Sequence, residues 1–202
     1  MQDSLRINAS ALLPRTFYER NTVRVAKELL GKVLVRRLGP MRLEGIIVET
    51  EAYRGRDDAA SHAYGGPTKR NQVMFGEPGH AYVYFTYGMH YCLNVTTEPT
   101  GQPGAVLIRA AQPINGIAEM MSRRRMRNVK DLANGPAKVT QAFAVTKALN
   151  GHDLTSGRKL YIAEPSHPEP CKTTTGIRIG IKAGAEKPWR FFVRGNPFVS
   201  KR

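Results

Sequence analysis

Two glutamates, a tyrosine and a histidine stand close together in the stretch VETEAYRGRDDAASH, residues 48–62. Two isoleucines precede it, and three β-branched apolar residues in succession indicate a strand in the core. If that strand is regular, Glu49, Glu51 and Tyr53 share one face, with the two carboxylates about 7 Å apart. At this separation one carboxylate raises the pKa of the other, which makes the pair a candidate for general-base chemistry.

Paired carboxylates are the usual means of cleaving a bond to the anomeric carbon of a sugar, because an activated water can then meet an oxocarbenium-like transition state. The alternative is that the strand simply ends here and both glutamates are solvated, which is the commoner situation for a single carboxylate at a strand end. Spacing alone treats Glu49 and Glu51 as equivalent. Spacing also assigns no role to His62, since a histidine in such a segment is more often an ordinary loop residue.

A metal site and a nucleotide cofactor are not expected. His62, His80 and His90 have neither HxxxH nor HxH spacing, and no cysteine or aspartate completes a ligand set. Cys92 and Cys171 lie far apart and form no CxxC, which indicates a reducing compartment rather than a disulfide framework. Neither GxGxxG after a strand nor GxxxxGK[ST] occurs, so a dinucleotide or NTP cofactor is not expected.

The charge balance indicates a polyanionic partner. The chain has 31 lysines and arginines against 16 aspartates and glutamates, a formal net charge of +15. Such a surplus attracts nucleic acid first and an anionic membrane surface second. The sequence has no apolar run of about 18 residues, and its N-terminal stretch lacks the pattern of a signal peptide, so we expect a cytoplasmic protein without a membrane partner.

The elements that must position these residues predict an α+β fold: a single domain with a mostly antiparallel curved sheet, flanking helices and a protruding β-hairpin. We expect one domain over residues 1–202, with 1–15 a loosely ordered N-terminal segment. The strand that begins at Ala105 should end at Pro113, and Gly31 should close a helix in the left-handed conformation. Besides the hairpin, strands are predicted at residues 32–38, 43–51, 105–113, 159–164, 176–182 and 189–195, and helices over 23–30, 114–127 and 136–149.

The hairpin is predicted from the sequence AYVYFTYGMHYCLNVTT, residues 81–97, with Tyr87 and Gly88 near its tip. Aromatic side chains in a sheet usually pack across strands, and this accounts for most of the rings here. It accounts poorly for Tyr87, because a ring beside the turn glycine would project into solvent. On a basic protein, an aromatic residue in this place resembles the wedges that enter the minor groove of DNA and unstack a base step.

Several long motifs follow one another in a fixed order, and together they resemble those of a known family. VETEAY, with a histidine nine residues after its tyrosine, is followed by YVYFTYGMHYCLN, GAVLIRAAQP, NGPAKVTQA and finally RIGI and RFFVRGNPFVS. With this order and spacing the chain resembles the alkyladenine (3-methyladenine) DNA glycosylases over nearly everything after residue 15. The long N-terminal extension of the mammalian members is absent here, which favours a bacterial member.

The resemblance implies a monofunctional DNA glycosylase of base excision repair. Such an enzyme flips alkylated or deaminated purines, of the 3-methyladenine, 7-methylguanine, hypoxanthine and ethenoadenine class, out of duplex DNA. It hydrolyses the N-glycosidic bond with a water activated by a glutamate and leaves an abasic site. The resemblance also implies no metal, no organic or nucleotide cofactor, a monomer, and double-stranded DNA containing damaged purines as the partner, in a bacterium at the nucleoid.

Matching positions of the family imply the catalytic residues. Glu51 looks like the general base that activates water against C1′, whereas Glu49 returns to a structural role. His62 and Arg109 look like groups that hold the water and the carboxylate in place, with the backbone carbonyl of Ile179 as a further ligand of the water.

The same matching positions imply which residues bind the base and the DNA. Tyr53 and Tyr84, with His62, look like the walls between which the flipped base stacks, and such rings attract a cationic methylated base. Asn94 looks like a filter against normal guanine, because its side chain would clash with the 2-amino group. Tyr87 looks like the residue that fills the gap left in the helix. The positions where the family touches the DNA backbone or groove are Thr68, Arg70 and Met89.

Two departures from the mammalian members and two other functions stay open. The segment between Gly66 and Asn71 is one residue shorter, which affects the backbone contacts, and His90 replaces a tyrosine beside the wedge. A different class of function is a non-enzymatic nucleic-acid-binding module that uses the basic surface and the hairpin for binding or bending. Another is a glycosylase that also nicks the strand through a lysine Schiff base.

Overall fold

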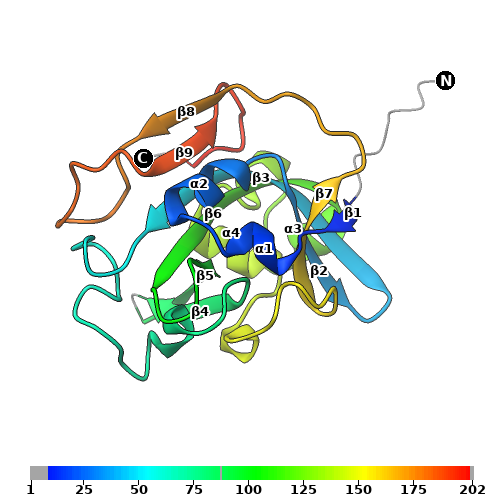
Figure 1. Cartoon of the computed structure of the whole chain (residues 1–202). Coiled ribbons are helices and arrows are strands. Elements are labelled where there is room, and N and C mark those ends of the chain that lie inside the picture. The colour runs from blue at the N-terminus through cyan, green and yellow to red at the C-terminus, as the bar shows by residue number, and fades with distance from the viewer. Residues whose placement is uncertain (1–8, 87, 201–202) are drawn as a thin grey trace.

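The computed structural model describes residues 9–86 and 88–200. Within them, nine strands form one sheet in the order β1-β7-β2-β3-β6-β5-β4, with β9 and β8 attached at the side of β3 (Figure 1). Every pairing is antiparallel, so the predicted α+β fold with a mostly antiparallel sheet is confirmed. The strands are β1 Ala9–Leu12, β2 Val33–Leu38, β3 Met41–Tyr53, β4 Ala81–Thr86, β5 His90–Thr97, β6 Gly104–Asn115, β7 Leu160–Pro165, β8 Thr173–Gly176 and β9 Arg190–Val193.

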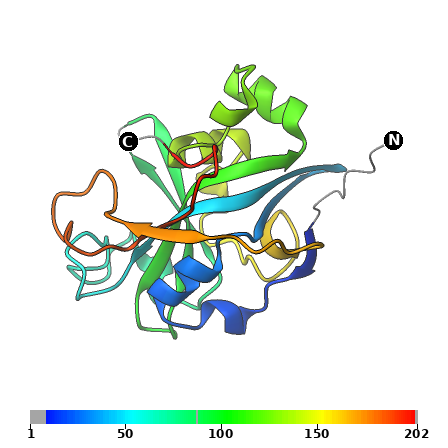
Figure 2. The same ribbon diagram turned by 90° about the horizontal axis from the view of Figure 1, so that it is seen from above.

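Helices cover both faces of the sheet, with α1 and α2 on one side and α3 and α4 on the other (Figure 2). Thr50 of β3 donates to the carbonyl of Ala26 in α2 at 2.7 Å, whereas Gly45 of the same strand lies against the ring of Phe143, just after α4. A Cβ at Gly45 would lie 2.9 Å from that ring, so glycine permits the close packing. The helices are α1 Arg15–Tyr18, α2 Thr22–Glu28, α3 Ile117–Arg124 and α4 Pro136–Ala142, and the 3-10 turns are η1 Gln72–Phe75, η2 Val129–Asp131 and η3 Lys147–Leu149.

The predicted boundaries of α2 follow from its capping residues. The Asn21 side chain accepts hydrogen bonds from the amides of Val23 and Arg24, which satisfies two of the donors left unpaired at the start of a helix. Gly31 has a φ of 84°, so the left-handed position expected after the helix is present. The helix packs its buried Val25 on the sheet.

The sheet is built around β3. This strand pairs with β6 over almost its whole length, whereas on its other edge β2 pairs with the first half and β9 pairs with residues 49–51. The register with β6 shifts between Ile47 and Thr50, as in a β-bulge. Residues 49–51 are therefore enclosed by neighbouring strands on both edges, and their side chains meet those of β6 and β9.

The predicted hairpin consists of β4 and β5. Only its base joins the rest of the sheet, because β5 pairs with β6 from Asn94 to Thr97. Beyond that point β4 and β5 pair with each other as far as Thr86 and His90, so the tip protrudes from the sheet. Gly88 has a φ of 68°, and the tight turn requires a residue that tolerates this conformation. Tyr87, the predicted wedge, lies outside the described residues.

Two predicted boundaries are wrong. Pro113 does not end its strand, because β6 continues to Asn115. Pro113 is paired with Gly45 beside a register shift, a place where a strand tolerates a residue without an amide donor. The helix predicted over 136–149 ends at Ala142, since Ala144 takes a φ of 50° and the chain re-forms a separate turn, η3.

The strand predicted over residues 176–182 is also wrong. The strand β8 ends at Gly176, and the following residues form an irregular loop. Residues 176–182 alternate between apolar and polar types, as the residues of a strand do. In the structure, however, Arg178 is buried and Ile177 is exposed, the reverse of what hydrophobicity favours. The loop leaves the sheet because Arg178 binds a buried aspartate, as described below.

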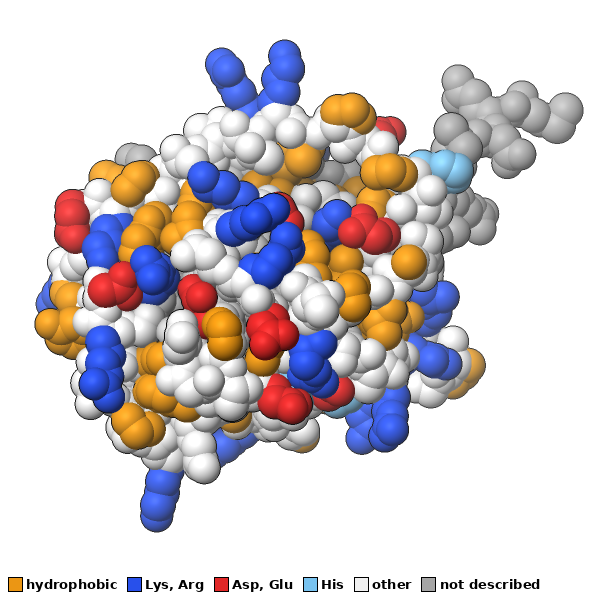
Figure 3. All heavy atoms as spheres, viewed as in Figure 1, with side chains coloured by type: hydrophobic (Ala, Val, Ile, Leu, Met, Phe, Trp, Pro, Cys, Tyr) orange, Lys and Arg blue, Asp and Glu red, His pale blue; other side chains and the backbone are white. Residues whose placement is uncertain are grey.

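The core is one large apolar cluster between the sheet and the helices, with Tyr18, Phe143 and Phe191 among its fully buried side chains. On the face that carries α1 and α2, basic and acidic side chains are interspersed (Figure 3). Glu28, for example, pairs with both Arg20 and Arg24. In the described part of the chain, no helix is long and apolar enough to cross a membrane.

Candidate active site

The end of β3 carries two buried carboxylates that share one arginine. Glu49 and Glu51 are both 0% exposed, so the alternative of two solvated glutamates is wrong. Arg109 of β6 donates from Nε to Glu49 at 3.0 Å and from Nη1 to Glu51 at 3.3 Å. The predicted placement of both glutamates on one face is confirmed, and Arg109 neutralises charge that burial would otherwise make very unfavourable.

Glu49 is held by several donors from distant parts of the chain. Arg190 of β9 donates to its Oε1 at 2.6 Å. Ser200 donates its amide to Oε2 at 2.7 Å and its hydroxyl to Oε1 at 2.9 Å. Together with Arg109, these groups occupy both carboxylate oxygens. Glu49 therefore anchors β6, β9 and the C-terminal segment to β3.

Glu51 is held by three residues that all line the same cavity. The Tyr53 hydroxyl donates to Oε2 at 2.7 Å, the Ile179 amide donates to Oε1 at 2.7 Å, and Arg109 completes the set. Burial raises the pKa of Glu51 above its ordinary value, although Arg109, Ile179 and Tyr53 oppose the shift. A raised pKa makes the carboxylate a stronger base than a solvated one.

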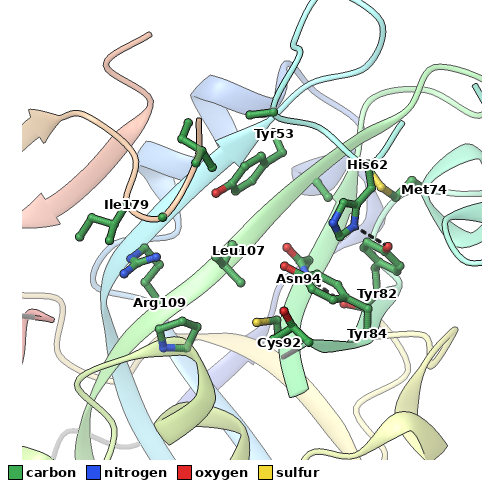
Figure 4. Close-up of a pocket in the computed structure, with 16 residues that line it drawn as sticks. Tyr53, His62, Met74, Tyr82, Tyr84, Cys92, Asn94, Leu107, Arg109 and Ile179 are labelled. Atoms are coloured by element: carbon green, nitrogen blue, oxygen red, sulfur yellow. Dashed lines mark hydrogen bonds between the residues drawn. The ribbon is translucent and has the colours of Figure 1, made fainter. Parts of the chain in front are cut away.

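The cavity next to Glu51 has a volume of about 420 Å³, within the range of small-ligand sites. In Figure 4, Tyr53 extends into it from one side, and His62 and Tyr84 lie on the other. Glu51 does not line the cavity itself but lies behind the wall that its partners form. The predicted site residues that line the cavity are Tyr53, His62, Tyr84, Asn94, Arg109 and Ile179.

Two aromatic rings form one side of the cavity together. His62 and Tyr84 meet edge to face, with ring centroids 4.6 Å apart and an angle of 71° between their planes. Rings in such contact leave no slot between them, so a planar ligand can stack only between this pair and Tyr53. The His62 Nδ1 pairs with the Tyr82 hydroxyl at 2.8 Å, which leaves Nε2 to face a ligand. Partial burial, helped by nearby Arg70, lowers the pKa of His62, so the ring is neutral at physiological pH.

The back of the cavity is formed by β5 and β6. Asn94 is 3% exposed and donates from its amide to the Tyr82 carbonyl at 3.1 Å, which fixes its orientation. Cys92 also lines the cavity, and burial raises the pKa of its thiol. A thiol with a raised pKa is a poor nucleophile.

A buried ion pair behind Tyr53 escaped the sequence analysis. Arg178 donates to both oxygens of Asp58, at 2.6 Å and 2.8 Å, and both side chains are 0% exposed. Arg178 also donates to the carbonyls of Ala52 and Gly184, at 2.9 Å each. The pair joins the loop that leads to His62 to the loop that carries Ile179. The sequence signal was present in the double aspartate of RGRDD, but no spacing rule connects it to a residue so far along the chain.

The remaining predicted residues lie at the outer edge. Thr68 and Arg70 are exposed, on a turn that Asn71 organises by accepting from the Thr68 amide at 2.6 Å and donating to the His62 carbonyl at 2.7 Å. Met89 is 68% exposed beside the hairpin turn. Asn71 was not predicted, although an asparagine three residues after a threonine is a common turn signal.

Among the described residues, no group of three or more histidine, cysteine, aspartate or glutamate side chains could hold a metal ion. The cavity thus offers four aromatic rings and a fixed amide, with a buried carboxylate directly behind its wall and an arginine that orients that carboxylate. Such a set can bind a flat ring by stacking and can deprotonate a water beside it.

Comparison with known proteins gives consistent matches. A family model described as methylpurine-DNA glycosylase (MPG) matches residues 16–197. Three similar proteins carry the provisional name 3-methyladenine DNA glycosylase. That of Carboxydothermus hydrogenoformans is 54% identical and covers 95% of this chain and 100% of its own length. That of Methanocella arvoryzae is 49% identical, with 95% and 96% covered, and that of Desulfitobacterium hafniense is 46% identical, with 93% and 98% covered.

Proposed function

The chain belongs to the methylpurine-DNA glycosylase family, and we propose that it excises alkylated and deaminated purines from duplex DNA with a water activated by Glu51. The family predicted from the ordered motifs is thereby confirmed. The chain is a DNA glycosylase, a hydrolase of the N-glycosyl bond that acts in base excision repair. The proposal extends to the bases it accepts and to the residues that carry out the reaction.

The first step is the entry of a flipped base into the cavity. Extrusion from the duplex costs a few kcal/mol, and the cost is smallest for a damaged or mispaired base. Stacking of a base on an aromatic side chain contributes about 1–3 kcal/mol. Tyr53 on one side and the His62–Tyr84 pair on the other supply two stacking surfaces, which together offset the cost of flipping.

The second step is hydrolysis. Water attacks C1′ while Glu51 takes its proton, and the bond from C1′ to the purine nitrogen breaks, with the electron pair leaving on the base. The negative charge of Glu51 also favours the positive sugar of an oxocarbenium-like transition state. Arg109 orients the carboxylate through its 3.3 Å hydrogen bond, and Glu49 holds Arg109 in place from the other side.

Glu51 needs a small opening before it can meet water, because its carboxylate is completely buried. Besides Arg109, its partners are the Tyr53 hydroxyl and the amide of Ile179, which lies in the irregular loop after β8. Stacking of a base against Tyr53 would displace that hydroxyl and admit the water. The carboxylate would then act as a base only when a ligand is bound.

The same cavity supports the choice of substrates. A cationic base such as 7-methylguanine is a good leaving group already, whereas neutral hypoxanthine needs more help from the enzyme. Asn94, held by the Tyr82 carbonyl, would meet the 2-amino group of normal guanine. The contact would disfavour normal guanine, whereas 7-methylguanine, which carries the same 2-amino group, would still be excised because its positive charge makes it a good leaving group.

The DNA itself is expected to contact the outer edge of the cavity. Thr68, Arg70 and Met89 are exposed, and Tyr87, predicted from the sequence to lie near the hairpin tip, is proposed to fill the gap in the duplex. The net charge of +15 favours phosphate contacts and predicts strongly salt-dependent binding. We propose that one copy of the chain acts alone on the duplex.

The two alternative functions are less well supported. A module that only binds DNA has no use for a buried carboxylate with a raised pKa directly behind an aromatic cavity. A glycosylase that nicks the strand needs a lysine at the reacting sugar. Within the described residues, the cavity lining contains no lysine. Borohydride treatment during the reaction should therefore trap no covalent adduct.

The observation that carries the proposal is the position of Glu51, buried behind the stacking cavity and bonded to three of its lining residues. Glu51→Gln should lower the rate of hypoxanthine excision by about 10²–10⁴-fold, the usual contribution of a general base. Abasic sites in a duplex oligonucleotide are counted after alkaline cleavage, without added metal. Binding to the same duplex, measured by fluorescence anisotropy, should persist.

A matched control comes from the same strand. Glu44 is 1% exposed on β3 and pairs with Arg42, away from the cavity. Glu44→Gln therefore removes a buried carboxylate without touching the proposed reaction, and its excision rate should stay close to that of wild type because Glu44 does not line the cavity. Excision by Glu51→Gln at the wild-type rate would refute the assignment of the base.

A further inference from the structure

Each tyrosine wall of the cavity has an arginine against its ring. The guanidinium of Arg178 lies 4.8 Å from the ring centroid of Tyr53, and that of Arg70 lies 5.1 Å from the ring centroid of Tyr84. Both tyrosines line the cavity, whereas neither arginine does. Each guanidinium therefore lies over a ring that a stacked base would also contact, close enough for its charge to act on that base.

A ring that already bears a cation is a weaker partner for a second one. The face of an aromatic ring attracts positive charge through its quadrupole, and the attraction is stronger where water is excluded. In a stack of guanidinium, tyrosine and cationic base, the two outer charges repel each other across the ring. A neutral base in the same place meets no such repulsion and keeps its stacking energy.

The two arginines differ in whether a carboxylate neutralises their positive charge. Arg178 is completely buried and bonded to both oxygens of Asp58, so its charge is compensated within the same site. Arg70 is exposed, and no carboxylate of the described residues lies within ion-pair distance of it. The uncompensated charge beside the cavity is thus that of Arg70.

Arg70 also connects to the third ring. Its positive charge acts on the hydroxyl of Tyr82, which in turn pairs with the His62 Nδ1 at 2.8 Å. Together with burial, the same charge lowers the pKa of His62 and so favours the neutral ring. Arg70 therefore acts on both members of the ring pair that faces Tyr53.

We propose that Arg70 is a specificity-determining residue that lowers the preference of the cavity for cationic alkylated purines relative to neutral ones. The inference rests on the proposed function and deepens it, because it concerns which damaged purines the site favours. The electron-rich rings alone favour a cationic base, and Arg70 shifts the balance toward neutral bases such as hypoxanthine. Arg70 has this effect from the ring face of Tyr84, in addition to any contact with DNA phosphates.

The test compares two lesions in otherwise identical duplexes, one with 7-methylguanine and one with hypoxanthine. Excision is measured under single-turnover conditions, and the ratio of the two rate constants is the readout. Arg70→Gln should raise the ratio of 7-methylguanine to hypoxanthine excision about fivefold over wild type, the change that loss of about 1 kcal/mol of repulsion gives. Because each variant is compared with wild type on the same lesion, differences in intrinsic leaving ability cancel.

Two controls separate the ring contact from ordinary charge effects. Arg70→Lys keeps a cation in place and should leave the ratio close to wild type. Lys69→Gln removes one positive charge from the adjacent exposed position, which contacts no ring among the described residues, and should slow both reactions equally. If Arg70 only contacts phosphates, Arg70→Gln will also slow both reactions equally, and an unchanged ratio overturns the inference.

Failure of the inference is distinguishable from failure of the proposed function. If wild type excises neither lesion, the proposed function fails. If wild type excises both and Arg70→Gln leaves the ratio unchanged, only the role of Arg70 fails. Thermal unfolding of each variant shows that the exposed substitutions keep the fold, so a lost activity is not mistaken for a changed preference.

Discussion

Glu49 and Glu51 are the same residue type, two positions apart on one strand and equally buried, yet their surroundings differ in kind. Glu49 is bonded by Arg190 and Ser200, which contribute nothing to the stacking surfaces of the cavity. Glu51 is bonded by Tyr53 and Ile179, which form the cavity wall. The comparison teaches that burial alone does not distinguish an anchor from a reactive group; the location of the bonding partners does.

Arg109 joins the two environments and prevents either carboxylate from being isolated. If Glu51 is removed, Arg109 keeps Glu49 as a partner. If Glu49 is removed, Arg109 keeps Glu51, but Arg190 loses its only carboxylate partner among the described residues. The anchor should therefore matter more for stability and the reactive group more for turnover.

The largest expected effect on stability comes from removing Glu49, which anchors the neighbouring strands to β3. Glu49→Ala leaves a buried Arg190 without a counter-charge and should lower the free energy of unfolding by about 3–5 kcal/mol. Glu51→Gln should lower it by no more than about 1.5 kcal/mol, because its hydrogen bonds are replaced in part. Urea unfolding followed by circular dichroism measures both. Equal losses in the two variants would contradict the division of roles.

The next effect concerns pH. Excision requires the ionised form of Glu51, so the single-turnover rate should be constant at high pH and fall about tenfold per pH unit below the pKa of Glu51. Because burial raises that pKa, the fall should begin above the ordinary glutamate range of about 4.3. A profile of hypoxanthine excision against pH tests this. A midpoint at the ordinary value would mean that Glu51 is solvated during the reaction.

A third effect concerns the hydrogen bond from Tyr53 to the reactive carboxylate, Glu51. Tyr53→Phe keeps the stacking ring and removes the hydroxyl that donates to Glu51 at 2.7 Å. Since that bond favours the ionised carboxylate, its loss should raise the pKa of Glu51 further and move the acidic fall of the profile to higher pH. Loss of one such bond costs about 0.5–1.5 kcal/mol of stability. A profile that moves to lower pH would contradict the contact.

The smallest expected effect is on the anchor side. Ser200→Ala removes a hydroxyl donor to Glu49 but keeps the backbone amide that binds the other oxygen. The free energy of unfolding should fall by about 1 kcal/mol, and the excision rate per folded molecule should not change. A large loss of excision at unchanged stability would show that Glu49 takes part in the reaction after all.

Local patterns in the sequence were sufficient for much of the fold. Alternation placed Glu49 and Glu51 on one face, the turn glycine located the hairpin, and Gly31 marked the end of α2. These features depend on neighbours within a few residues, which periodicity and turn chemistry report directly. Patterns failed where a distant contact outweighed the local preference, as at Arg178, which left its predicted strand for Asp58.

The sequence by itself determined the family, most of the sheet-forming segments and a set of candidate residues for the chemistry, because long ordered motifs and side-chain periodicity are properties of the chain. It could not separate the two glutamates by spacing, since their surroundings come from residues as far as 151 positions away. Only the tertiary structure decided that Ser200 hydrogen-bonds Glu49 and that Ile179, a residue of the cavity wall, hydrogen-bonds Glu51. It also decided that an arginine lies against the ring of each tyrosine wall. Packing brings such groups together and removes water from around them, and this burial raises the pKa of Glu51.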